Sequence, residues 1–349
     1  MKAVRAHATQ AAVIEEHQTP VPGPDNVIVK TLKSGICGSD LHTIRRLRNG
    51  LTQIEPLMGH EVCGVVSELG PGVETAQIGD RVAVEPLFRC GVCSNCIAGR
   101  YNICDDREFL LGTYEDRPGA LAEYFEIPAY CLVGVDDSLS DEEGALTEPL
   151  AVGVHAMKAA QPGYRPSVGV VGAGTIGLAV VAAAAAAGAS AITVVARHPH
   201  QREAATKLGA TRVIAIGEDD SEETIHERLN GDPPPEIVVE TVGGAAETIN
   251  ISLRLVHLGG TISMVGGFWE SPSVDLEMML MKEVRLAPSN CYSSVEGASD
   301  FKDAMAIIRS NPLFAETMLT HRFPLEAATD AFQTAFDKST RSIKVMLNP

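Results

Sequence analysis

Residues 168–177 read VGVVGAGTIG, and this stretch decides the fold of the region around it. An apolar run leads into three glycines in the pattern G-x-G-x-x-G, which are Gly172, Gly174 and Gly177. The first glycine permits a tight turn, the second lets backbone approach a pyrophosphate, and the third lets a helix pack closely on the strand. Because a helix opening at Thr175 and Ile176 would aim free N–H groups at that turn, we predict a dinucleotide-binding turn. A glycine-rich turn with a structural role is the alternative.

Strand-like and helix-like segments alternate outward from this turn, across residues 153–291. The strand-like runs are VGVVG, AITVVA, RVIAIG, EIVVET and TISMVG. Such alternation predicts a Rossmann domain, a doubly wound parallel sheet with helices on both faces. Residues 166–196 carry no charge and are long enough to cross a bilayer, but five glycines divide them into strand, helix and strand. We therefore interpret them as buried structure and expect no membrane span.

The residues after the second strand bear on the choice of cofactor. AITVVA ends at Ala196 and is followed by Arg197. An NAD site normally has an acidic residue about twenty positions after the glycines, whereas an NADP site places an arginine near the 2′-phosphate. Because arginine pairs with a phosphate that a carboxylate would repel, we predict NADP(H) over NAD(H), with His198 and His200 as further donors. A solvent-exposed Arg197 without influence on the cofactor is the alternative.

Residues 1–152 have a different texture. Short Val/Ile segments such as NVIVKTLKSGI and GDRVAVEPL stand between glycines and prolines. This pattern predicts an antiparallel, barrel-like β-rich domain. Residues 292–349 contain a helix-like segment, SDFKDAMAIIRS, and a strand-like one, IKVML, which we expect to return to this first domain.

Four of the eight cysteines lie in CGVCSNCIAGRYNIC, and they are Cys90, Cys93, Cys96 and Cys104. Four thiolates can close a tetrahedron around Zn²⁺ and leave no position for a substrate. We therefore predict a structural zinc ion. An iron–sulfur cluster also uses four thiolates and is the alternative, whereas a redox C-x-x-C pair would need only two.

Cysteine, histidine and carboxylate residues recur in three other stretches, GICGSDLH, PLMGHE and LTEPLAVGVHA. Together they supply Cys37, Ser39, Asp40, His42, His60, Glu61, Glu148 and His155. Each residue alone is weak evidence, since a lone cysteine or histidine is more often packed or solvated. Together, beside a dinucleotide turn, they indicate a catalytic zinc with few protein ligands and an exchangeable oxygen ligand.

The motifs GICGSDLH, GHE, GDRV, CGVCSNCIAGRYNIC, TEPLAV and VGAGTIG resemble those of the zinc-containing medium-chain dehydrogenase/reductase family. They occur in the family's order over essentially the whole chain, and most resemble the sorbitol, threonine and secondary-alcohol dehydrogenase branch. The resemblance implies a GroES-like catalytic domain, residues 1–152 and 292–349, around an inserted Rossmann domain, residues 153–291. It also implies that the cleft between these domains holds cofactor, zinc and substrate.

The same resemblance assigns the ligands of two zinc ions per chain. Cys37 and His60 would bind the catalytic zinc, with Glu61 and Glu148 as third and fourth candidates, one of which acts through water or exchanges during turnover. Glu148 stands where liver-type alcohol dehydrogenases have a cysteine, which favours the polyol branch. The four-cysteine loop matches the family's structural zinc lobe without departure.

The resemblance also assigns the residues around the reacting centre. Ser39 and His42 would form a hydroxyl–ribose–imidazole proton relay, for which a histidine pKa near neutrality is suitable. Val152 would pack against the nicotinamide, and His155 would be structural. Asp40 is predicted to be a turn or helix cap. The remaining cysteines, Cys63, Cys131 and Cys291, are interpreted as buried thiols.

These residues predict a zinc-dependent oxidoreductase that transfers a hydride between NADP(H) and a secondary alcohol or polyol, or the matching ketone. One alternative is an NAD-dependent threonine- or sorbitol-type dehydrogenase. Another is a non-catalytic nucleotide-binding scaffold, although such a scaffold would be expected to lose its ligands. Three arginines after the first ligand, Arg45, Arg46 and Arg48, could attract an anionic or polyhydroxy substrate, but a solvated basic loop is the favoured interpretation.

Length and charge limit the remaining possibilities. The 349 residues suit about two domains, and the net charge of −17 argues against a nucleic-acid partner. The start, MKAVRAHATQ, has no apolar core of a secretory signal, so we expect a cytoplasmic protein whose clustered cysteines bind metal rather than form disulfides. We expect a homotetramer, with a dimer as the alternative.

Overall fold

The computed structural model describes the chain except for residues 107–109, 218–219, 221, 230–232, 245 and 269. Contacts divide the chain into two compact units. Unit 1 is Met1–Glu148 with Ser293–Pro349, and unit 2 is Pro149–Tyr292. The sequence placed the first boundary at 152/153, whereas the structure has one continuous helix there, α4 (Thr147–Ala159).

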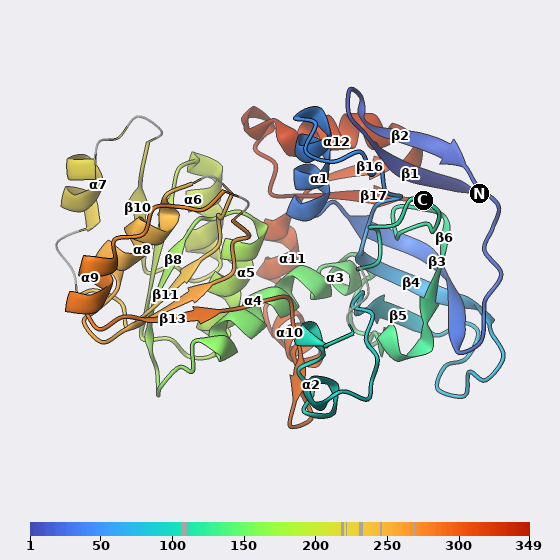
Figure 1. The fold of residues 1–349 in the computed structure, drawn as a ribbon, viewed down its shortest axis with the longest axis horizontal. Helices are drawn as coiled ribbons and strands as arrows, with labels where there is room; N and C mark the ends of the chain where they lie inside the picture. Colours follow the sequence, from blue (N-terminus) through green and yellow to red (C-terminus); the bar gives the residue numbers. More distant parts are fainter. Residues whose placement is uncertain (107–109, 218–219, 221, 230–232, 245, 269) are drawn as a thin grey trace. The chain divides into compact units, whose positions relative to one another are not determined.

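Unit 2 is built on a six-stranded parallel sheet in the order β10-β9-β8-β11-β12-β13 (Figure 1). Its strands are β8 (Ser167–Val171), β9 (Ala191–Ala196), β10 (Arg212–Ala215), β11 (Ile237–Glu240), β12 (Thr261–Met264) and β13 (Arg285–Pro288). The strand order reverses between β8 and β11, which confirms the doubly wound fold. The sequence did not predict β13. This strand has only four residues, including an arginine and a proline, and it is mostly exposed, so it lacks the apolar run of a buried strand.

The helices of unit 2 connect successive strands. They are α5 (Thr175–Ala186), α6 (Pro199–Lys207), α7 (Glu222–Leu229), α8 (Thr248–Leu255) and α9 (Leu276–Met281), besides α4. α5 is buried from Gly177 to Ala184, which explains the uncharged sequence there. Among the described residues, no helix has the length and apolar character needed to cross a membrane.

Unit 1 is β-rich. A sheet of seven strands has the order β16-β17-β3-β4-β5-β7, with β6 also paired to β3 (Figure 1). These strands are β3 (Asn26–Gly35), β4 (Glu61–Leu69), β5 (Arg81–Val84), β6 (Tyr124–Pro128), β7 (Leu132–Gly134), β16 (Leu319–Pro324) and β17 (Lys344–Asn348). Two hairpins accompany the sheet, β1 (Lys2–His7) with β2 (Ala11–Glu16), and β14 (Ser294–Val295) with β15 (Ala298–Ser299). All its pairings are antiparallel except β16 with β17, as expected of a GroES-like unit.

The helices of unit 1 come from both ends of the chain. They are α1 (Gly38–Arg48), α2 (Ser94–Ile97), α3 (Asp141–Ala145), α10 (Asp300–Ser310), α11 (Leu313–Met318) and α12 (Ala328–Phe336), with short 3₁₀ turns at η1 (Tyr101–Ile103), η2 (Ala129–Cys131), η3 (Leu325–Ala327) and η4 (Lys338–Thr340). One apolar core joins α1 through Ile44 and Leu47 to α12 through Phe332 and to β17 through Val345. The C-terminal residues therefore complete the fold of unit 1.

Strand register positions the residues that carry chemistry. Gly35, at the end of β3, lies opposite Glu61, at the start of β4. Cys37 follows β3 and His60 precedes β4, so both lie at the same end of the sheet. Met346 of β17 also pairs with Gly35, which brings Lys344 to this end. A Cβ on Gly35 would overlap the Glu61 carboxylate, so a larger residue there would displace Glu61.

Candidate active site and metal centres

The first predicted ligand, Cys37, is the N-cap of α1. Asp40 closes a capping box, since its Oδ2 accepts a hydrogen bond of 2.9 Å from the Cys37 N–H. Asp40 is thus a helix cap, as predicted, and it fixes the backbone that carries Cys37. Ser39, in the first turn of the same helix, has its Oγ 3.4 Å from His60 Nε2.

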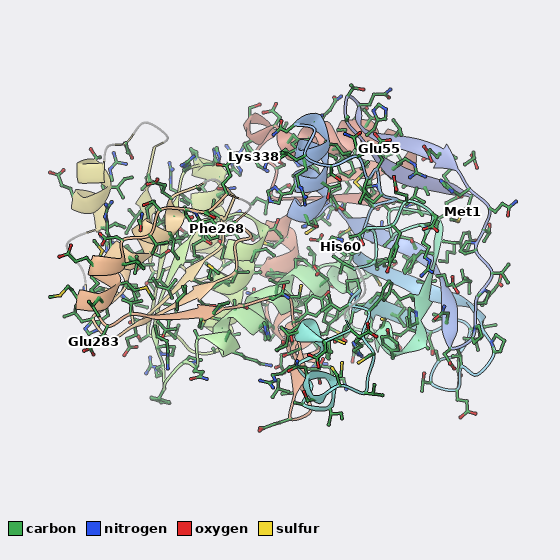
Figure 2. All side chains as sticks on the ribbon, viewed as in Figure 1. Met1, Glu55, His60, Phe268, Glu283 and Lys338 are labelled. Atoms are coloured by element: carbon green, nitrogen blue, oxygen red, sulfur yellow. The ribbon has the colours of Figure 1, made fainter. Side chains whose placement is uncertain are left out.

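His60, labelled in Figure 2, is buried, and residues that can carry negative charge act on it. Burial would lower the pKa of this imidazole, but the Cys37 thiolate, Asp40 and Glu148 outweigh burial and raise it to about 10. The structure therefore places two other predicted ligands, Cys37 and Glu148, near enough to His60 to influence its charge. Their field favours a positive charge at the imidazole, as it would favour a cation.

Glu61, the remaining predicted ligand, forms an ion pair with Lys344. The Lys344 Nζ lies 2.6 Å from one carboxylate oxygen and 2.5 Å from the other, and both side chains are 1% exposed. Burial would lower the lysine pKa, but Glu61 and then Cys37 raise it, so Lys344 stays charged. The sequence analysis missed Lys344, whose only signal is one lysine inside the apolar run IKVML. Its partner lies 283 positions away, which no local pattern reveals.

The donor types of this group fit zinc, because thiolate, imidazole and carboxylate are its usual protein ligands. The donor atoms are not gathered as tightly as in the cysteine loop. Across the described parts of the chain, that loop is the one place where metal-binding atoms of three or more side chains all lie within 4.8 Å of one another.

In the cysteine loop, the sulfur separations fit a single ion. They are 3.5 Å for Cys90–Cys104, 3.9 Å for Cys93–Cys104 and 4.0 Å for Cys90–Cys96. A tetrahedron with Zn–S bonds of about 2.3 Å has edges of about 3.8 Å, whereas a disulfide needs about 2.05 Å. An iron–sulfur core of several atoms would hold the thiolates farther apart. The geometry therefore supports one tetrahedral ion.

Backbone groups stabilise the Cys93 thiolate in this loop. Cys93 is the N-cap of α2, and its sulfur accepts a hydrogen bond of 3.4 Å from the Cys96 N–H. Backbone N–H groups of Asp105 and Cys96 lower the Cys93 pKa to about 6. Metal binding requires the deprotonated form, so these hydrogen bonds favour it.

The loop is anchored on two sides. The Arg89 guanidinium lies 4.1 Å from the centre of the Tyr101 ring, and the Tyr101 hydroxyl donates a hydrogen bond of 2.9 Å to buried Glu85. On the other side, Ser294 N–H donates to the Gly99 carbonyl over 2.9 Å. A Cβ on Gly99 would overlap the Ser294 carbonyl, so this contact requires glycine.

In unit 2, the glycine turn has the geometry that its pattern predicts. Gly172 has φ +97°, and a Cβ on Gly177 would overlap the Gly172 carbonyl, which shows close helix–strand packing. Nothing lies within 4 Å of a Cβ position on Gly174, so space is open beside it. Thr175 and Ile176 begin α5 as predicted.

A pocket of about 290 Å³ adjoins this turn. Its lining residues include the three residues Gly172, Ala173 and Gly174, the end of β9 at Ala196, and Arg197 and His198. Among the described residues that line it there is no carboxylate. A site that binds phosphates through arginine and free N–H groups has this composition.

Glu240, at the end of β11, stabilises the loop that lines another side of this pocket. The sequence did not predict this role. Glu240 Oε1 accepts hydrogen bonds from Val242 N–H (2.8 Å), Gly243 N–H (3.0 Å) and Thr248 Oγ1 (2.7 Å). Thr241 Oγ1 in turn donates to the Val171 carbonyl over 2.9 Å. The Glu240 carboxylate thus fixes the loop that packs against the glycine turn.

The other predicted residues have varied surroundings. Val152 and His155 lie on α4 and are half-buried. His42 is half-buried on α1, and burial, followed by Arg45, lowers its pKa to about 4. His42 is therefore neutral at pH 7, rather than titrating near neutrality as its residue type suggests.

Two of the three remaining cysteines are buried as predicted, Cys63 and Cys131. The prediction for Cys291 was wrong. This residue is only half-buried, at a backbone φ of +56°, and its sulfur lies 3.4 Å from Asn290 Oδ1. The bend of the backbone at Cys291 leaves its thiol partly exposed.

Comparison with known proteins agrees with this geometry. The family model "Alcohol dehydrogenase GroES-like domain" matches residues 23–137, and "Zinc-binding dehydrogenase" matches residues 175–310. The chain is 34% identical to a sorbitol dehydrogenase of Bacillus subtilis (strain 168), over 100% of this chain and 97% of that protein. It is 32% identical to a D-xylulose reductase of Scheffersomyces stipitis, over 91% of this chain and 90% of that protein.

A solved structure is similar over the full length. Galactitol-1-phosphate dehydrogenase from Escherichia coli superposes with a TM-score of 0.88 at 27% identity, covering 100% of both chains. Fold, site and relatives together define a zinc-dependent oxidoreductase of the alcohol dehydrogenase type. The chain belongs to the zinc-containing medium-chain dehydrogenase/reductase family, as the sequence motifs predicted.

We expect Cys93→Ser to open the cysteine loop without touching the reacting residues. Zinc per chain, measured by atomic emission, should fall by about one, and the Tm should fall by about 5 °C or more as the loop loses its cross-link. Cys291→Ser is the control, since that thiol lies outside the loop. An unchanged metal content and Tm in Cys93→Ser would contradict the assignment of this loop as a metal site.

Proposed function

We propose that this chain is a zinc-dependent dehydrogenase that oxidises a polyol or similar secondary alcohol, or reduces the matching ketone, with NADP(H) preferred over NAD(H). The observation that carries the proposal is the group formed by half-buried Cys37 with buried His60 and Glu148, in which the Ser39 hydroxyl lies 3.4 Å from His60 Nε2. Relatives named sorbitol dehydrogenase and D-xylulose reductase support the polyol class. Glu148 in place of a cysteine also supports it.

We propose that Cys37, His60 and Glu148 hold the catalytic metal. When bound there, zinc supplies a Lewis acid that favours the deprotonated form of the substrate oxygen. Both carboxylate oxygens of Glu61 accept hydrogen bonds from Lys344. In our proposal, Glu61 therefore holds the positively charged Lys344 near the sulfur of Cys37. Four thiolates, from Cys90, Cys93, Cys96 and Cys104, hold the second zinc, which is structural.

Ser39 is the residue in this proposal that receives the substrate proton. Its hydroxyl is an acceptor and a donor, and it stands in the first turn of α1 beside His60. His42 lies one turn further along the same helix and is neutral at pH 7, so it can accept a proton relayed from Ser39. Val152 is proposed to contact the nicotinamide.

Cys37→Ser should lower kcat/KM by about 1000-fold or more, because an alcohol ligand replaces the thiolate and metal is lost. Zinc content should fall from about two to about one per chain, while NADPH titrated against protein fluorescence should bind as before. The substrates are polyols, simple secondary alcohols and amino alcohols, each read by the absorbance of the reduced cofactor. If the wild-type protein, loaded with two zinc ions and binding cofactor, oxidises none of them, it is the non-catalytic scaffold.

The cofactor proposal depends on the pocket at Arg197. α6 begins two residues after Arg197, with His198 as N-cap, Pro199 at the first position and no acidic residue in the first turn. A helix N-terminus without carboxylates favours a bound phosphate. Arg202 donates a hydrogen bond to the Arg197 carbonyl and so fixes the backbone of Arg197.

We expect kcat/KM to be at least about 10-fold higher with NADP than with NAD, because a charged hydrogen bond contributes ~1.5–3 kcal/mol. Arg197→Gln should remove most of this preference by raising the KM for NADP, while the KM for NAD changes little. NAD thus serves as the internal control. A wild-type enzyme that prefers NAD would be the sorbitol- or threonine-type alternative.

For assembly, we propose that unit 2 pairs with a second copy through β13. This edge strand pairs with β12 on one side, and α9 beside it exposes Leu276 (69%), Leu280 (74%) and Met281 (74%). A sheet edge next to exposed apolar side chains favours pairing about a two-fold axis. A tetramer and a cytoplasmic location remain predictions from the sequence.

Leu280→Glu should weaken this pairing, because it places a charge in an apolar contact. Sedimentation of the wild-type chain should give twice or four times the 37.0 kDa of one chain, and the variant should give a smaller assembly. Leu51→Glu, at an exposed leucine of unit 1, is the control. A wild-type protein that sediments as a monomer would contradict the proposal.

A further inference from the structure

We infer that Arg45 and Lys338 form a binding site for a phosphate group, and that the alcohol oxidised at the proposed metal site therefore carries a phosphate at its far end. The inference rests on the proposed function and names the substrate class.

The reacting residues and Arg45 lie along one face of α1. Ser39, His42 and Arg45 are spaced three residues apart, so they follow each other along the helix surface. Arg45 Nη1 lies 3.5 Å from His42 Nδ1. A substrate whose oxygen is near Ser39 can therefore extend along this face to the Arg45 guanidinium.

Two of the cations, Arg45 and Arg48, pack over the ring of Phe336. The Arg45 guanidinium carbon lies 5.5 Å from its centre and that of Arg48 lies 4.9 Å from it. Lys338 stands two residues after Phe336, on η4, and is labelled in Figure 2. Its Nζ donates a hydrogen bond of 2.9 Å to the Ala335 carbonyl, which leaves other N–H groups of the ammonium for a ligand.

Cations here are not balanced by acids, although the chain has a net charge of −17. Within the parts of the chain that the structure describes, no carboxylate forms an ion pair with Arg45, Arg46, Arg48 or Lys338. The nearby Asp337 turns its carboxylate to the Ser339 N–H at 2.8 Å. Burial, then Arg45 and Lys344, lower the Lys338 pKa, so like charges stand close to this ammonium. A bound anion would offset their repulsion.

The helix also sets the length of the substrate. Ser39 and Arg45 are six residues apart, which is about 9 Å along a helix axis. An extended chain advances roughly 1.2 Å per bond, so seven or eight bonds cover this distance. A five- or six-carbon polyol with a terminal phosphate has that length. Arg45 can bind the phosphate through two N–H groups, and Lys338 adds the second positive charge that a dianion requires.

The test compares neutral polyols with their terminal phosphate esters, using zinc-loaded full-length protein. Sorbitol and sorbitol 6-phosphate form one pair, and xylitol and xylitol 5-phosphate form the other, each with NADP and with NAD. We expect kcat/KM to be about 10-fold or more higher for the esters. Arg45→Gln and Lys338→Gln should each lower the ester-to-polyol ratio by about 10-fold, mainly through the KM of the ester.

Arg117→Gln is the matched control, because Arg117 is also an exposed arginine of unit 1 over an aromatic ring, at 5.3 Å from Tyr114. This variant should leave the ratio unchanged. Thermal unfolding checks that the variants are folded, and Arg45→Gln alters an exposed side chain, so the test does not depend on Lys338→Gln.

Three results would overturn the inference. Neutral polyols used as well as their esters would refute it and leave the proposed function standing. If Arg45→Gln instead weakens NADP binding measured without substrate, these cations serve the cofactor's phosphates. If neither polyols nor esters reduce either cofactor, although zinc and cofactor are bound, the proposed function fails together with the inference.

Discussion

The buried ion pair between Glu61 and Lys344 is a contact on which unit 1 depends, because neither charge is tolerated in the interior without the other. Two charges at 1% exposure are costly to desolvate, and they are tolerated because Lys344 reaches both Glu61 oxygens and the Ile36 carbonyl. Loss of one partner would leave the other charge buried, at a cost of ~3–5 kcal/mol. The pair joins the last strand of the chain to the strand that follows His60. The residues that we propose to be catalytic are therefore positioned only when the two ends of the chain have met.

This dependence explains how an inserted unit can be accommodated. Unit 2 interrupts unit 1 between Glu148 and Ser293, so the residues after Ser293 must find their place in a sheet begun almost 300 residues earlier. The cysteine loop contributes at that point, since Gly99 accepts the Ser294 N–H. A metal ion bound by the four cysteines would make the Gly99 side of this hydrogen bond more rigid. In this interpretation, the structural metal stabilises the return of the chain, not the chemistry.

Short-range patterns predicted the parts of the protein whose physics is local. The glycine turn, the cap at Asp40 and the four-cysteine spacing each depend on residues within about fifteen positions, so sequence suffices for them. The role of Glu240 could not be predicted in this way. An acidic residue at the end of a strand is common, and its role here depends on the loop that it stabilises beside the nucleotide pocket. The role of Lys344 could not be predicted either, because it depends on a partner 283 residues away in the sequence. The low pKa of His42 also required the structure, since burial and Arg45 together decide it.

A small phosphate group is influenced more by the charges near its binding site than by the net charge of the whole chain. At physiological ionic strength the Debye length is about 8 Å, so a phosphate responds to the groups within that distance rather than to the whole chain's −17. Both units place arginine locally, Arg197 beside the glycine turn and Arg45 on the face of α1. Among the described residues, no carboxylate lines the pocket at Arg197 and none forms an ion pair with Arg45. The remaining acidic surface favours solubility. The two proposed phosphate sites are therefore compatible with the negative net charge, since arginine supplies positive charge locally at each of them.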